Sequence, residues 1–292
     1  MKKKILIAFL IIITIYIFFQ LQNTKSIQID KIYVINLDRS TERLAHMQNT
    51  LDKLDLPVKY TRLSAFDGKN IELVNKETGE RIKGTEFTSN TKLLKGKFDI
   101  ICAPYWDGGL KLVALNLKFN HRTAGEIGCM CSHMKIWQDI KKNGYKNTLI
   151  FEDDVVLSPY FDKYLSIALK FVPIDFDVLY FSVTADYWHY NAKTRNKSLN
   201  KITNIFNLVF KYTFFKRIRR EAAGTVAYIL SQEGVQKLID NMPISAEGYL
   251  TSDRVLGTLI TKKILRAYVI KPLMAEQSKI INSSIANINN SR

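Results

Sequence analysis

Three consecutive carboxylates, Glu152, Asp153 and Asp154, follow an apolar run that ends at Phe151. The run Leu149–Phe151 predicts a buried strand, and three charges at its end cannot all be buried without partners. A divalent cation would relieve this cost, because Mg²⁺ and Mn²⁺ prefer oxygen ligands and Mg²⁺ sites commonly pair one or two carboxylates with substrate phosphates. The alternative is a solvated acidic turn ahead of the next helix, and the acids alone do not decide between the two.

Two further predicted strands bring polar positions toward the same sheet edge. The run Lys31–Leu37 predicts a strand, the spacing from Thr41 to about Leu54 predicts a helix, and Val58–Ala65 predicts a second strand. In open α/β sheets, ligands bind beyond the carboxyl ends of the strands. We therefore expect four positions near the acids: Asn36, Arg39, Asp67 and Gly68. The alternatives are a solvated arginine at a helix start and an ordinary Asp-Gly turn.

A long helix is predicted over Thr123–Asn143, where a Thr-x-x-Glu start matches a capping box and two lysines precede a glycine at the end. Glu126 and His133 share one face of this helix. A histidine on such a face is more often a packing residue than a ligand. Cys129 and Cys131 are two positions apart and point to different faces, which argues against a joint metal site and favours buried thiols. Three cysteines give no disulfide framework.

The remaining pattern predicts one α/β domain. The other expected helices and strands are helices over Pro159–Phe171, over 231–241 and from Thr251, and strands over Phe176–Val183, Gly224–Leu230 and Ile264–Ile270. Glycines, charges and a proline interrupt residues 69–120. We expect loops with short strands there, covering the site, because about 50 residues are few for a second domain.

The net charge of +16, from 43 Lys and Arg against 27 Asp and Glu, speaks to the partners of the chain. Nucleic acid, an anionic membrane surface and an anionic substrate are the options. Nothing resembles a helix that reads a DNA groove, so we expect no nucleic acid partner. Basic and aromatic residues interleave over 186–221, which favours an anionic membrane or acceptor, with a solvated loop as the alternative.

The N-terminus combines Lys2–Lys4 with the apolar run Ile5–Phe19. No convincing cleavage site follows, so we expect an uncleaved single-pass membrane anchor over 5–21, with a cleaved signal as the alternative. The positive-inside rule would place the lysines in the cytoplasm, but one short loop leaves the side of the main domain open. The divisions are then a basic start (1–4), anchor (5–21), linker (22–30), main domain (31–280) and polar tail (281–292).

Several motifs occur in an order that resembles glycosyltransferase family 25. They are INLDRSTER (35–43), AFDG (65–68), GEIGCMCSH (125–133), LIFEDDV (149–155), GTVAYILSQEGVQKLI (224–239), SDRVL (252–256) and a closing segment with Pro272 and Gln277. The resemblance covers roughly residues 31–280. It implies a GT-A-like nucleotide-binding sandwich with a mostly parallel central sheet. It also implies transfer of a sugar, commonly galactose from UDP-galactose, to a saccharide, glycolipid or glycoprotein, with inversion and with Mn²⁺ or Mg²⁺.

The resemblance also implies roles for individual residues. The stretch Glu152–Asp154 takes the place of the family's Asp-x-Asp metal motif. Within it we expect Glu152 and Asp154 on one side of the strand end and toward the metal, with Asp153 toward the donor. The first strand and the turn at Asp67 would line the nucleotide pocket.

Inversion requires a base near the acceptor hydroxyl. Asp253 is the leading candidate and Glu126 the second, although an acid that opens a helix is also favoured by the helix dipole alone. The family usually has Pro-Val-Asp where this chain has Thr251-Ser252-Asp253. The alternative function is a non-catalytic, membrane-attached relative that keeps the fold and acts as a binding or scaffolding protein.

Overall fold

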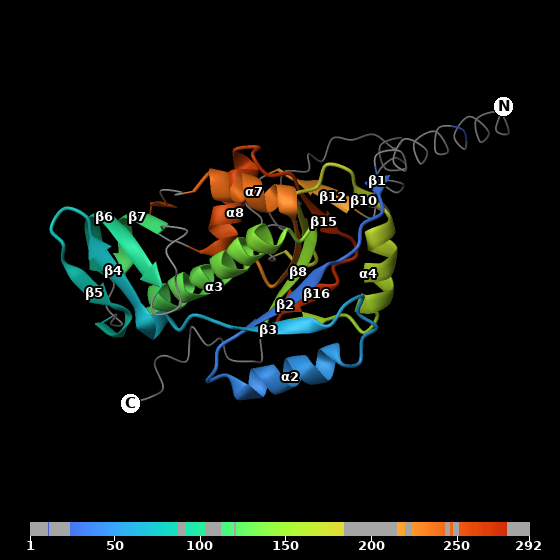
Figure 1. Ribbon diagram of the computed structural model, residues 1–292, viewed down its shortest axis with the longest axis horizontal. Helices are drawn as coiled ribbons and strands as arrows, with labels where there is room; N and C mark the ends of the chain where they lie inside the picture. The colour runs from blue at the N-terminus through green and yellow to red at the C-terminus, as the bar shows by residue number, and fades with distance from the viewer. Residues whose placement is uncertain are drawn as a thin grey trace, which may run out of the picture.

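The computed structural model describes residues 11, 24–86, 92–102, 112–119, 121–183, 215–219, 224–242, 246–247 and 251–278. Its largest sheet has seven strands in the order β12-β15-β11-β13-β8-β2-β3. Their bounds are β2 Lys31–Asn36, β3 Tyr60–Ser64, β8 Asn147–Glu152, β11 Val178–Tyr180, β12 Phe215–Ile218, β13 Ala227–Ser231 and β15 Ala267–Ile270. This mixed α/β architecture fits a GT-A-like fold (Figure 1).

The expectation of a mostly parallel sheet is wrong. Strands β8, β2 and β3 are parallel neighbours, and β11 is parallel to β15. Strand β13 is antiparallel to both β8 and β11, and β12 is antiparallel to β15. A fully buried strand reads as apolar whichever direction it runs, so the run 224–230 did not report its direction.

The βαβ unit at the start of the domain is confirmed. Helix α2 (Thr41–Leu51) connects β2 to β3, and the two strands pair in parallel from Ile32 with Tyr60 to Asn36 with Ser64. The parallel arrangement brings the ends of β2 and β3 to the edge at which β8 ends, since Ile35 pairs with Glu152. The predicted sheet edge therefore exists.

The expectation of loops with short strands over residues 69–120 is correct only in part. A five-stranded sheet in the order β14-β7-β6-β4-β5 lies at the end of the molecule away from α4 (Figure 1). Its strands are β4 Ile71–Asn75, β5 Arg81–Lys83, β6 Lys92–Cys102, β7 Leu112–Phe119 and β14 Ala246–Glu247. Gly96 and several charges interrupt the alternation of β6, which also carries a bulge between Leu94 and Lys97, and these features obscured the strand in the sequence pattern.

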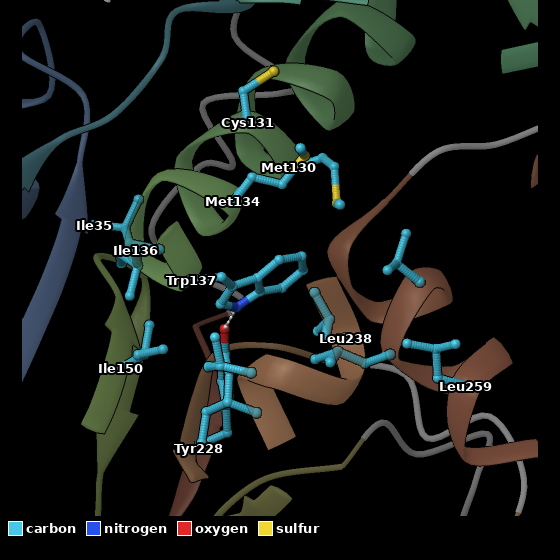
Figure 2. Close-up of a cluster of buried hydrophobic side chains, with 14 of the residues drawn as sticks. Ile35, Met130, Cys131, Met134, Ile136, Trp137, Ile150, Tyr228, Leu238 and Leu259 are labelled. Carbon is cyan, nitrogen blue, oxygen red and sulfur yellow. Dashed lines mark hydrogen bonds between the residues drawn. The ribbon is translucent and has the colours of Figure 1, made fainter. Parts of the chain in front are cut away.

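Helix α3 (His121–Asn143) joins the two sheets into one core, and it begins two residues before the predicted start. Trp137, fully buried, projects from α3 toward the seven-stranded sheet, with its indole N–H directed at the Tyr228 hydroxyl (Figure 2). The same cluster includes Leu238 of α7 (Gln232–Asp240) and Leu259 of α8 (Ser252–Thr261). One apolar body thus supports every element that reaches the acids.

Helices α7 and α8 begin where the sequence predicts, and each has a side-chain cap. The Ser231 side chain accepts a hydrogen bond from the amide of Gly234, and Thr251 accepts one from the amide of Arg254. On the other face of the sheet, helix α4 (Phe161–Lys170) covers a second apolar cluster. Two short ladders tie down the edges: β1 (Thr24–Lys25) pairs with β10 (Val172–Pro173), and β9 (Val155–Leu157) pairs with β16 (Ala275–Gln277).

The termini and the cysteines complete the comparison with the sequence. The predicted anchor at 5–21 lies outside the described residues apart from Ile11, as do the tail at 281–292 and most of 186–221. Within the described ranges, no helix combines the length and the apolar character needed to cross a bilayer.

Cys131 is in a disulfide whose partner lies outside the described side chains, so the expectation of a buried thiol there is wrong. Cys129 is a free thiol, as expected.

Candidate functional site

A cavity of about 100 Å³ lies beyond the carboxyl ends of β2, β3 and β8. All three acids, Glu152, Asp153 and Asp154, line it together with Arg39 and Gly68. A larger cavity of about 640 Å³ adjoins it, and Gln277 lines both. The larger one holds no cluster of charged groups among the described residues, so the chemistry belongs to the smaller cavity.

Asp153 is held by two partners and serves the structure of the site. Its Oδ1 pairs with Nη1 of the buried Arg43 at 2.5 Å, and its Oδ2 accepts a hydrogen bond from Nδ2 of Asn36 at 2.7 Å. Burial nevertheless raises the pKa of Asp153 above its ordinary value, against the effects of Arg43 and Asn36. Because both carboxylate oxygens are engaged by the protein, Asp153 is poorly placed to bind a ligand.

Asp154 has a buried oxygen that the protein does not satisfy. Its Oδ2 accepts a hydrogen bond from Nε2 of Gln277 at 2.9 Å and lies 3.7 Å from Nη2 of Arg43. Its Oδ1 is buried and has no hydrogen-bond partner among the described residues. Burial, followed by the charge of Glu152, raises the pKa of Asp154 to about 6. A cation at Oδ1 would remove both penalties, since a buried carboxylate is favourable only when it is paired.

Glu152 belongs to a third environment. Its Oε1 accepts a hydrogen bond from the Thr225 hydroxyl at 2.6 Å and lies 3.2 Å from Nε2 of His133. Burial works against the ionisation of Glu152, but the hydrogen bonds from His133 and Thr225 outweigh it and hold the pKa of Glu152 below its ordinary value. Glu152 is therefore a fixed negative charge in the wall of the cavity.

A chain of hydrogen bonds behind Glu152 sets the tautomer of His133. The indole of Trp137 can only donate, and it donates to the Tyr228 oxygen at 3.2 Å. The Tyr228 hydroxyl proton then points to Nδ1 of His133 at 2.8 Å, which leaves the ring proton on Nε2, directed at Glu152. With this assignment Trp137, Tyr228 and His133 form a continuous series of hydrogen bonds that ends at Glu152. The expectation that His133 packs in the core is correct in part: it is fully buried, and it also positions a site residue.

The position of His133 would also allow it to take part in a metal site. Ligand atoms of Cys129, His133 and Glu152 lie within 4.8 Å of one another, as a thiophilic metal site would require. Burial raises the pKa of the Cys129 thiol well above its ordinary value, and a hydrogen bond links the thiol to Ser252. The Nε2–H group of His133 donates a hydrogen bond to Glu152, and the Cys129 thiol keeps its proton. The polar groups of the three residues therefore have partners within the protein and do not require an ion.

Arg39, Asp67 and Gly68 form the opposite rim. The Arg39 guanidinium pairs with the Asp67 carboxylate, and Asp67 also accepts a hydrogen bond from the amide of Lys69. Arg39 is 40% exposed, so its charge is available to an anion that enters the cavity. Gly68 lies against α3, where a Cβ atom would come within 2.2 Å of the Ala124 carbonyl oxygen. These three predicted positions are brought together, as the sheet edge requires.

Neither of the two predicted bases is among the residues that line the cavity. Asp253 opens α8 directly after Ser252, whose hydroxyl is 2.8 Å from that of Thr225, the partner of Glu152. The Asp253 carboxylate is bonded by the Thr251 hydroxyl and by the amide of Arg254 at 2.8 Å. Glu126 is buried in α3 and is not among the side chains that line the cavity.

Arg43 and Thr225 belong to this site but were not predicted from the sequence, and Asn36 has a different role from the predicted one. Asn36 holds Asp153 and does not itself line the cavity. Arg43 was not among the predicted site residues, and it is buried beneath the acids. Its position four residues before the buried Met47, on the same face of α2, is the signal that could have identified it. Thr225 gave no such signal, because its role depends on the pairing of β13 with β8.

Comparison with known proteins gives a match to one family and to several relatives. The sequence model of glycosyltransferase family 25 (LPS biosynthesis protein) matches residues 29–255. Procollagen galactosyltransferase 1 of Danio rerio is 24% identical over 88% of this chain and 35% of its own length. Procollagen galactosyltransferase 2 of Homo sapiens is 26% identical over 82% of this chain and 32% of its own length. The probable inactive glycosyltransferase 25 family member 3 of Rattus norvegicus is 27% identical over 74% of this chain and 30% of its own length. The chain spans about a third of the length of these curated relatives.

Proposed function

The chain belongs to glycosyltransferase family 25, and we propose that it transfers galactose from UDP-galactose to a hydroxyl of a saccharide, glycolipid or glycoprotein, with inversion and with the help of Mn²⁺ or Mg²⁺. Membership of the family supports a nucleotide-sugar-dependent glycosyltransferase. The names of two relatives support galactose as the sugar and a glycoprotein as one class of acceptor.

One observation carries the proposal: the buried, unsatisfied Oδ1 of Asp154 at the wall of the cavity. An oxygen ligand of this kind suits Mg²⁺ or Mn²⁺, which take few protein ligands when substrate phosphates supply the rest. The residues present therefore fit the metal, with Asp154 as its direct ligand. Glu152, committed to His133 and Thr225, is the weaker of the two predicted ligands and would contribute its charge.

The chemistry divides among the residues of the chain as follows. The bound metal supplies charge stabilisation to the diphosphate leaving group. Arg39 at the rim adds a positive charge to the same group, and Glu152 and Asp153 keep the cavity wall fixed. Asp253 accepts the proton of the acceptor hydroxyl as its oxygen bonds to the anomeric carbon, while the bond from that carbon to the diphosphate oxygen breaks.

We further propose that residues 5–21 anchor the chain in a membrane as a single span. The unbroken apolar run after three lysines supports this. The acceptor would then be presented at or near a membrane surface. A reporter fused to the C-terminus would determine on which side of the bilayer the enzyme domain lies.

A non-catalytic relative is the second candidate, because one relative carries the name of a probable inactive member. The hydrogen bonds that hold the Asp253 carboxylate also occupy the proposed base. Metal-dependent binding of the donor without turnover would support this candidate over the enzyme.

A donor screen tests the proposal. The full chain, purified in detergent, is incubated with UDP-galactose, UDP-glucose and other nucleotide sugars in Mn²⁺, and UDP release is measured with and without EDTA. We expect release with UDP-galactose that EDTA abolishes and that excess Mn²⁺ restores. Absence of both UDP release and donor binding for every nucleotide sugar would refute the proposal.

A further inference from the structure

Exposed apolar side chains occur along and just after α4, and none of them is among the residues that line the two cavities. Among the described residues, and apart from Ile11 and Val156, the strongly exposed large apolar side chains all lie between positions 160 and 174. They are Tyr160 (57% exposed), Ile167 (45%), Phe171 (41%) and Ile174 (55%). We call these four residues the α4 face. Single exposed apolar residues need no explanation, but a cluster on one element does.

The positions of the α4 face in the sequence show that it follows the length of α4. Ile167 lies in α4, and Tyr160 and Phe171 flank the helix at its two ends, seven positions before and four positions after Ile167. The residues that α4 buries, including Phe161 and Leu165, occupy another side of the helix. The helix is therefore apolar on two sides, although only one of them packs on the sheet.

Positive charges border the α4 face. Lys163 and Lys170 lie beside its line of apolar side chains, both exposed, and the Lys163 ammonium is 5.5 Å from the centre of the Tyr160 ring. The acids in the neighbourhood are already engaged: Asp162 accepts a hydrogen bond from the amide of Asp55, and Asp175 accepts one from the Tyr268 hydroxyl. An aromatic and aliphatic stripe with lysines at its side is typical of a helix that lies in a membrane interface.

The N-terminal segment reaches the protein at this same face. Residues 1–23 contain the apolar run and its lysines, and the described chain resumes at β1, which pairs with β10 directly after α4. The amide of Ile27 bonds to the carbonyl of Leu169, next to Phe171. Figure 1 places β1, β10 and α4 together at the end of the molecule opposite the five-stranded sheet.

We propose that the α4 face docks on the surface of an anionic lipid bilayer, where Tyr160, Ile167, Phe171 and Ile174 enter the interface and Lys163 and Lys170 meet lipid phosphates. The inference rests on the proposed N-terminal anchor and is independent of the proposed transfer activity. A span that ends just before Thr24 brings the α4 face to the bilayer, because only a few residues separate the two. The docked face fixes how the domain stands on the membrane, with the five-stranded sheet directed away from it.

Tryptophan quenching tests this contact in the full chain. Ile167→Trp and a control, Lys141→Trp in the last turn of α3, are each placed in nanodiscs that contain phosphatidylglycerol brominated in its acyl chains. The three native tryptophans give a common background, measured in the unsubstituted chain. An interfacial helix buries its apolar face by about 5–10 Å, so we expect the Ile167→Trp emission to be quenched beyond that background and the Lys141→Trp emission to match it.

The lysines give a second, graded readout. Near an anionic surface each lysine strengthens the contact about fivefold, so Lys163→Gln with Lys170→Gln should weaken it by about 25-fold and raise the fraction of anionic lipid needed for quenching. Equal bromolipid quenching of Ile167→Trp and Lys141→Trp would overturn the proposal. Protection of Ile167→Trp from iodide without bromolipid quenching would also overturn it, and would assign the α4 face to a second copy or to residues 1–23. Failure of the chain to enter nanodiscs would overturn the anchor and the docking together, whereas UDP release reports only on the transfer activity.

Discussion

The two walls of the cavity are held in place by different means. On one wall, the acidic end of β8, separate side chains hold two of the carboxylates, with Asp153 paired with Arg43 and Glu152 hydrogen-bonded by His133. The other wall, the turn at 66–68, rests on α3 by close backbone contact. There the amide of Phe66 donates to the Ser132 hydroxyl, and a Cβ atom on Gly128 would come within 2.6 Å of the Phe66 carbonyl oxygen.

The acidic wall therefore determines the chemistry of the cavity, and the turn wall determines its shape. On the acidic wall, a substitution changes charge and hydrogen bonding while the backbone can stay in place. On the turn wall, a substitution must move a helix or a loop, because protein interiors have no spare volume. Activity should therefore be lost without loss of fold on the acidic wall, and fold should be lost first on the turn wall. Asp153 is an exception, because it lies on the acidic wall but its role is structural.

The largest effect is expected for Asp154→Asn. Loss of the proposed metal ligand should lower kcat/KM for the donor on the order of 10³-fold, because charge stabilisation by a metal supplies several kcal/mol. The free energy of unfolding should not fall, since burial raises the pKa of Asp154 to about 6 and the neutral form is thus favoured in the fold. UDP release and urea unfolding measure the two quantities. An active Asp154→Asn enzyme would remove the metal assignment.

Asp153→Asn should show the opposite balance. Burial raises the pKa of Asp153 as well, but this carboxylate is also the nearer ion-pair partner of Arg43, at 2.5 Å against 3.7 Å for Asp154. Breaking a buried ion pair costs about 3–5 kcal/mol of unfolding free energy, and we expect this cost to outweigh the relief of the burial penalty. Urea unfolding at neutral pH checks the value against Asp154→Asn as the matched control, the same substitution one residue away. A loss of stability no larger than that of the control would mean that the two aspartates are equivalent.

Gly68→Ala tests the turn wall. The added methyl group would meet the Ala124 carbonyl oxygen at 2.2 Å, and overpacking of this kind costs about 1–3 kcal/mol of unfolding free energy. Lys69→Ala, at the exposed neighbouring position, is the control and should change stability little. If Gly68→Ala kept full stability, the turn would not be fixed by its contact with α3.

The smallest effect is expected for His133→Ala. Loss of the hydrogen bond to Glu152 should lower activity about tenfold, the lower end for a residue that positions a metal-site carboxylate. His133→Gln can donate to Glu152 from a similar position and should recover part of the loss at an unchanged melting temperature. Equal losses for Ala and Gln would indicate a packing role only.

Local patterns predicted much of the fold. The βαβ unit at 31–64, the strand before the acids, and the helix starts at Ser231 and Thr251 depend on neighbouring residues, so the sequence reports them directly. The five-stranded sheet was not predicted, because its bulge, its glycines and its pairing with β14, over a hundred residues away, leave no period to read. The disulfide of Cys131 was missed for a related reason, since a pairing depends on distance in space rather than on spacing.

The sequence by itself determined that carboxylates would end a buried strand beside Arg39 and Asp67, because strand ends and turns are local and a parallel βαβ unit has few arrangements. The tertiary structure alone decided how the three acids differ. Asp153 found Arg43 and Asn36, and Glu152 found His133 and Thr225. Asp154 kept one unsatisfied oxygen. Adjacent positions in a chain have the same local signal, and only the partners that folding brings from α2, α3 and β13 distinguish them.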